Sequence, residues 1–144
     1  MAAFFTPLKA SRRLHMAGGV AHAKRLHARS LTYTVTATVY NAVPGQTDDE
    51  PFVTADNSRI KPYYGTEQRW LALSRDLLRH WGGKFQYGDT ISVRGISAAL
   101  DGVYTVHDTM NHRFRHCLDV LAHPSERISI YQKGVKIQKV SWRL

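Results

Sequence analysis

The chain has 144 residues, of which 43% are hydrophobic, which suffices for one folded domain with a core and excludes a wholly disordered chain. Its one cysteine, Cys117, excludes an intrachain disulfide framework and a zinc site made of cysteines alone. The formal net charge of +9 favours an acidic partner such as nucleic acid, anionic lipid or an anionic glycan.

The first 30 residues carry most of this charge. They contain six basic residues and no acidic one, so residues 31–144 keep only +3. No stretch there reaches the roughly 20 apolar residues of a membrane span or the roughly 7–15 of a signal-peptide core. We expect no transmembrane segment. We expect residues 1–30 to form a basic, flexible arm, which is either a targeting segment or the result of a start site placed too far upstream.

The remaining residues open with a strand pattern. Apolar and polar residues alternate over 31–40, which predicts a strand with Val35 and Ala37 on its buried face. Residues 41–60 are rich in Pro, Gly, Asp and Asn and predict a long loop. Loops of this length in small domains are often functional.

Residues 69–81 have two interpretations. Apolar side chains recur there at helical spacing: Trp70, Leu73, Leu77 and Trp81. This spacing predicts one amphipathic helix, ended by a glycine pair, with both tryptophans in the core. Alternatively, residues 69–73 form a strand, and Ser74 caps a short helix with Asp76 in its first turn.

Further strand patterns fill the rest of the chain. They cover residues 90–96, 103–107 and 117–122, and a closing hairpin of 128–132 and 135–140 around the turn Lys133-Gly134. Six or seven short strands with one short helical element predict a mainly β domain over residues 31–144. The expected form is a small closed barrel.

Three aspartates lie beside apolar stretches instead of in loops: Asp76, Asp108 and Asp119. Asp119 stands between Leu118 and Val120 in a strand. Because a buried, unpaired carboxylate costs several kcal/mol, Asp119 must be hydrogen-bonded, face a cleft or have a raised pKa. Asp76 and Asp108 have a second interpretation, in which they accept backbone N–H groups that tie the loops of the barrel.

The order of several short motifs resembles a known family. The motifs are TATVY at 36–40, TAD at 54–56, LALSRD at 71–76, YGDTI at 87–91, GVYTVHDTM at 102–110 and CLDV at 117–120. Over roughly residues 32–122 the chain is similar to the three-aspartate domain of the membrane-bound lytic transglycosylase A family and of bacterial cell-wall proteins. This resemblance implies a six-stranded double-psi β-barrel located in the cell envelope or periplasm.

The resemblance also implies an activity. Asp119 would be the catalytic acid and base that cleaves a peptidoglycan glycan strand, accompanied by Asp108 and Asp76. As an acid it would protonate the glycosidic oxygen, and as a base it would then take the proton of the C6 hydroxyl, giving a 1,6-anhydro product. Hydrolysis would need a second carboxylate, for which Asp108 is the candidate. The expected substrate-binding residues are Tyr40, Thr54, Asp56, Tyr64, Asn111 and Arg113.

Two other functions remain open. The loop 109–116 is bulkier and more basic than in the family, which motivates a non-catalytic glycan-binding barrel. The charge and the run Arg113-Phe114-Arg115 motivate a nucleic-acid-binding barrel, which we disfavour because the basic residues concentrate in the arm. His112, His116 and Cys117 match no metal motif, so we expect no metal, no cofactor and a monomer.

Overall fold

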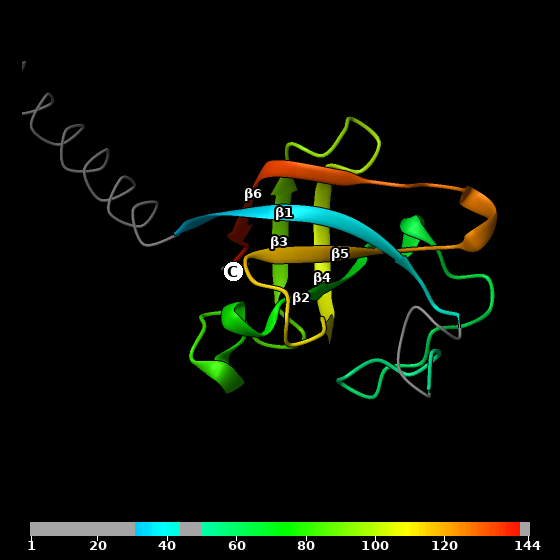
Figure 1. Cartoon of the computed structure of the whole chain (residues 1–144), viewed down its shortest axis with the longest axis horizontal. Helices are drawn as coiled ribbons and strands as arrows, with labels where there is room; N and C mark the ends of the chain where they lie inside the picture. The colour runs from blue at the N-terminus through cyan, green and yellow to red at the C-terminus, as the bar shows by residue number, and fades with distance from the viewer. Residues whose placement is uncertain (1–30, 44–49, 142–144) are drawn as a thin grey trace, which may run out of the picture. The chain divides into compact units, whose positions relative to one another are not determined.

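The computed structural model describes residues 31–43 and 50–141, so the arm expected over residues 1–30 lies outside the described residues. The described residues form six strands and several single-turn 3-10 helices, whose arrangement can be followed in Figure 1. The strands are β1 (Thr32–Asn41), β2 (Trp70–Leu73), β3 (Thr90–Arg94), β4 (Gly102–Thr109), β5 (Cys117–Ala122) and β6 (Tyr131–Lys139). The 3-10 helices are η2 (Thr66–Gln68), η3 (Arg75–Leu77), η4 (Arg79–Trp81) and η5 (Pro124–Glu126). The expected mainly β class is confirmed.

The six strands form one sheet that closes on itself in the order β1-β5-β2-β4-β3-β6. The pairs β1·β5 and β2·β4 are parallel, and the other four neighbouring pairs are antiparallel. Apolar side chains from all six strands fill the inside of this ring, among them Ala37, Leu71, Ile91, Val106 and Ile137. Burying each larger aliphatic side chain contributes about 1.5–3 kcal/mol relative to exposure, so this interior holds the ring together.

The strand order has an internal symmetry. Exchanging β1 with β4, β2 with β5 and β3 with β6 reproduces every neighbouring pair of the ring and its parallel or antiparallel sense. The two halves of the chain are therefore interleaved, because each parallel pair joins one strand from each half. The exchange maps two antiparallel pairs onto themselves, β2·β5 and β3·β6, and in the first of them Ala72 lies opposite Asp119.

The single helix predicted over residues 69–81 is wrong, and the alternative interpretation is confirmed. Residues 70–73 form a strand that pairs with β4 and β5, and Ser74 is the N-cap of η3 with Asp76 in its first turn. Trp81 is 43% exposed, so its expected place in the core is also wrong. The helical spacing was misleading because a strand and two separate turns supply its apolar residues.

The closing hairpin predicted over residues 128–140 is also wrong. Tyr131–Lys139 is one strand, β6, which pairs with both β1 and β3 and so closes the ring. Lys133-Gly134 lies inside it, at a register shift where these two residues of β6 oppose one residue of β1, Thr36. Gly134 has a φ of +75°, which glycine adopts without strain, so the turn signal in the sequence marks a β-bulge.

Candidate functional site

Four residues on four neighbouring strands form a row across the sheet. Thr38 of β1 pairs with Asp119 of β5, Asp119 with Ala72 of β2, and Ala72 with Asp108 of β4. Leu118 and Val120 point into the ring, so the alternation of a strand directs Asp119 to the outer face. Two carboxylates thus stand on either side of a methyl group, with their Cα atoms two strand spacings, or roughly 10 Å, apart.

A β-bulge places Asp108 in this row. Leu71 pairs with Val106 but Ala72 pairs with Asp108, so His107 is an extra residue in β4. Val106 points into the ring, and without the bulge the period of two would direct Asp108 inward as well. The bulge therefore turns the Asp108 carboxylate to the same outer face as Asp119.

Asp119 is a residue of this row with a raised pKa. Burial raises its pKa to about 6, and the negative charge of Asp108 adds to the rise. The Thr38 hydroxyl opposes the rise by donating a hydrogen bond of 2.8 Å to the Asp119 Oδ1. A carboxyl group with this pKa holds a proton in about half of the molecules at pH 6 and about a tenth at pH 7, against about a thousandth for an ordinary aspartate at pH 7.

Asp108 and Tyr40 lie beside Asp119. The Asp108 Oδ1 accepts the backbone N–H groups of Ala55 and Thr109, each at 2.9 Å. Tyr40 is 6% exposed, and burial, followed by the charges of Asp108 and Asp119, raises the pKa of its phenol. Tyr40 therefore remains a neutral hydroxyl donor beside the two carboxylates.

A cluster around Asp56 holds the preceding loop against β4. Asp56 accepts hydrogen bonds from the Thr54 hydroxyl at 2.6 Å and the Ser58 backbone at 3.1 Å, and its Oδ2 lies 2.8 Å from the His107 Nδ1. Although burial opposes the change, hydrogen bonds from Thr54, His107 and Ser58 lower the pKa of Asp56. This cluster anchors the loop that supplies the Ala55 N–H to Asp108.

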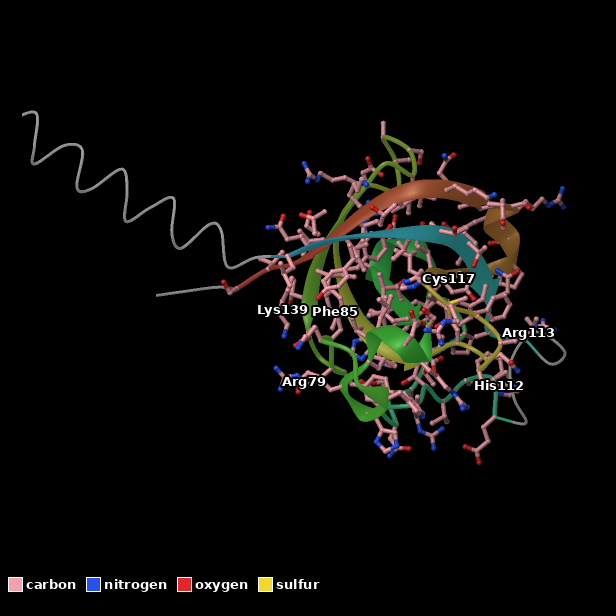
Figure 2. All side chains as sticks on the ribbon, turned by 60° about the vertical axis from the view of Figure 1, so that its left-hand side comes forward. Arg79, Phe85, His112, Arg113, Cys117 and Lys139 are labelled. Atoms are coloured by element: carbon pink, nitrogen blue, oxygen red, sulfur yellow. The ribbon has the colours of Figure 1, made fainter. Side chains whose placement is uncertain are left out.

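The row of four residues lies along a groove of about 760 Å³, a volume typical of small-molecule sites. Besides the row, its walls include Tyr40, Arg75, Asn111, Arg113 and Phe114. A smaller hollow of about 350 Å³ lies elsewhere and is lined by residues such as Arg79 and Phe85. Figure 2 shows Arg79 and Phe85 on one side of the ribbon and His112 and Arg113 on the other.

The structure brings five of the nine expected site residues to the groove: Tyr40, Asp108, Asn111, Arg113 and Asp119. Thr54 and Asp56 instead anchor the loop, and Tyr64 packs edge-on against Trp70 with ring centroids 5.2 Å apart. None of these three is among the residues that line the groove.

Asp76, the ninth expected residue, does not line the groove either. Its Oδ2 accepts the backbone N–H of His116 at 3.1 Å and lies 3.2 Å from the His116 ring nitrogen. His116 has a φ of +51°, a conformation that costs free energy for a non-glycine residue. Asp76 therefore stabilises the turn that leads into β5, as its backbone-tying interpretation predicted.

The groove residues that the sequence analysis did not expect at the site include Thr38, Ala72 and Arg75. Thr38 lies on the polar face of the predicted first strand. That face would indicate a groove residue only once it is known to line the groove. Ala72 and Arg75 lie in the segment whose helical interpretation was wrong, so their positions followed only from the pairing of β2.

Comparison with models of known protein families finds no match, and comparison with curated proteins finds none either. Within residues 31–43 and 50–141, no helix is both long and apolar enough to cross a membrane. The same residues contain no group of three or more side chains suited to hold a metal ion.

Proposed function

We propose that this chain is a double-psi β-barrel of the three-aspartate type that cleaves the glycan strand of peptidoglycan. The observation that carries the proposal is the Asp119 carboxyl group, which lies in a groove of about 760 Å³ with its pKa raised to about 6. The interleaved halves and the two parallel strand pairs support the barrel type.

In the proposed reaction Asp119 acts twice. Its carboxyl group first donates a proton to the glycosidic oxygen as the bond to the anomeric carbon breaks. The carboxylate then accepts the proton of the C6 hydroxyl on the same sugar, while that oxygen bonds to the anomeric carbon and closes a 1,6-anhydro ring. The proton returns to Asp119, so each turnover restores the acid form and consumes no water.

The neighbouring groups suit this reaction. The Asp108 charge helps to keep the proton on Asp119 and attracts the positive charge that develops on the sugar ring as the bond breaks. The Thr38 hydrogen bond fixes the direction of the Asp119 carboxyl group, and the neutral Tyr40 hydroxyl adds a donor beside Asp108. The methyl group of Ala72 leaves space between the two carboxylates for a sugar.

A non-catalytic glycan-binding barrel is the second candidate, favoured by the groove wall that Asn111, Arg113 and Phe114 supply. These residues offer hydrogen bonds and an aromatic face to a sugar. Both interactions can bind a glycan without cleaving it. The nucleic-acid alternative is less favoured, because two carboxylates in the groove would repel phosphate groups.

The test incubates the protein with purified peptidoglycan sacculi and analyses the soluble products by mass spectrometry. We expect anhydro-muropeptides from the wild type and a loss of at least about 100-fold in their release from Asp119→Asn. Glu67→Gln, which changes an exposed acid in η2, is the matched control and should keep full activity.

Each other product pattern assigns a different function. Reducing muramic ends instead of anhydro ends would show hydrolysis and make Asp108 the second carboxylate. No product from the wild type, with retained binding to sacculi, would contradict the enzyme and leave the binding barrel.

A further inference from the structure

Arg75 lines the groove on an aromatic support, as Arg113 does over Phe114, but among the described residues only Arg75 has a buried guanidinium donor without an acceptor. It is the first residue of η3 and lines the groove that contains Asp108 and Asp119. Its guanidinium also lies over the ring of Trp81, 4.9 Å from the centroid. Trp81 therefore fixes the direction of a side chain that would otherwise be flexible.

The donors of Arg75 lack partners within the described part of the chain. Among residues 31–43 and 50–141, its buried Nε has no hydrogen-bond acceptor and no carboxylate lies within ion-pairing distance of its guanidinium. A buried donor without an acceptor costs free energy, so a fold does not retain one for stability alone. This cost is recovered when a ligand supplies the acceptor.

Arg69 provides the contrast, because it is also stacked on an aromatic ring. Its guanidinium lies 5.0 Å from the Tyr104 centroid and donates to the carbonyls of Ala99 and Leu100 and to the Tyr104 hydroxyl, at 2.6–3.0 Å. Arg69 thus uses its donors inside the fold and closes a loop. Arg75 has the same aromatic support and keeps its donors for the groove.

We propose that Arg75, supported by Trp81, is a binding site for a carboxylate of the glycan, so that the groove takes acidic glycan strands in preference to neutral ones. This proposal rests on the proposed function of the same groove. A planar guanidinium matches a carboxylate through two parallel hydrogen bonds. The carboxylates of Asp108 and Asp119 require the part of the ligand that lies over them to be uncharged, so the acidic group is placed toward Arg75.

Two carboxylates of peptidoglycan have this chemistry. One is the lactyl group of muramic acid, which is free only in strands without stem peptides, and the other belongs to the stem peptides. The test uses three purified ligands of equal sugar length: a chitin oligosaccharide without a carboxylate, a peptidoglycan strand stripped of peptides, and a strand that keeps them. Binding is measured by calorimetry with full-length Asp119→Asn, so that no ligand is cleaved.

We expect at least one acidic strand to bind about tenfold or more tightly than the chitin oligosaccharide, which corresponds to a charge-assisted hydrogen bond. The strand that shows the preference identifies the carboxylate. Adding Arg75→Gln should remove the preference for the acidic strand over the chitin oligosaccharide, and Arg75→Lys should keep part of that preference. Arg94→Gln, an exposed arginine on β3, is the matched control and should change neither affinity.

Three outcomes overturn the proposal. Equal affinity for all three ligands, or a preference that survives Arg75→Gln, contradicts the site and leaves the cleavage of glycans intact. No binding to any ligand contradicts both the site and the proposed function. If Arg75→Gln fails to show a normal thermal transition, the salt dependence of the preference decides instead, because a preference that persists undiminished at 1 M salt is not electrostatic.

Discussion

The groove and the loop between β3 and β4 each contain an aspartate whose pKa is shifted, and the two shifts have opposite directions. Asp101 of the loop accepts the backbone N–H groups of Gly95, Ile96 and Ser97 at 2.8–3.1 Å, with the Gly95 hydrogen bond the main cause of its lowered pKa. Asp119 of the groove is buried, accepts a hydrogen bond from Thr38 and has a raised pKa.

The difference shows that the surroundings of an aspartate determine whether it fixes a loop or holds a proton. An aspartate whose oxygens are occupied by backbone donors is stabilised as a carboxylate and fixes a loop. An aspartate that is buried beside another acid is destabilised as a carboxylate and holds its proton at higher pH. The first contributes to stability, whereas the second lowers stability and gains a chemical role.

Of the substitutions that test this comparison, Asp119→Asn should change the free energy of unfolding the most. Because folding raises the pKa of Asp119, the folded state holds the proton more tightly, and stability falls as the pH rises from about 4 to about 6. The amide stays neutral and keeps an acceptor for Thr38. We expect the variant to have a higher free energy of unfolding at pH 7, on the order of 2 kcal/mol.

Urea unfolding at several pH values measures this difference. The gain should disappear at pH 3, where Asp119 is protonated in both states. A variant that is less stable than the wild type at pH 7 would assign Asp119 a structural role.

A smaller effect of opposite sign is expected from Asp101→Asn. Its folded pKa is lowered, so its contribution to stability is present above the ordinary pKa of an aspartate and is lost as the pH falls through the lowered value. The amide accepts the three backbone N–H groups less well than a carboxylate. Because the site is solvent-exposed, we expect a loss of about 1 kcal/mol at pH 7, measured by urea unfolding.

The release of anhydro-muropeptides by Asp101→Asn should equal that of the wild type at a temperature where both are folded. A loss of activity without a loss of stability would show that the loop takes part in the site. It would contradict the contrast between a structural Asp101 and a chemical Asp119.

Parts of this fold were predictable from the sequence because alternation is a local signal. The first strand and the strand at 117–122 follow from it, and so does the unusual position of Asp119 between Leu118 and Val120. The predictions of a helix over 69–81 and of a closing hairpin were wrong. Their local signals were helical spacing and a Lys-Gly pair, and strand pairing overrides both.

The candidate site was predictable only as a set of residue types. Asp108 reaches the groove through a bulge at His107, and the β2·β5 register places Ala72 beside Asp119. Neither feature leaves a mark on the local sequence. The same holds for Arg75, whose role depends on the absence of an acceptor for its Nε among the described residues.

The proposed reaction depends on the raised pKa of the Asp119 carboxyl group. The most direct test follows its carboxyl carbon by NMR as a function of pH in the full-length protein, with Asp119→Asn to assign the signal. We expect a titration midpoint at about 6. A midpoint near 4, the value of an ordinary aspartate, would contradict it, because the groove would then hold a carboxylate with no proton to donate.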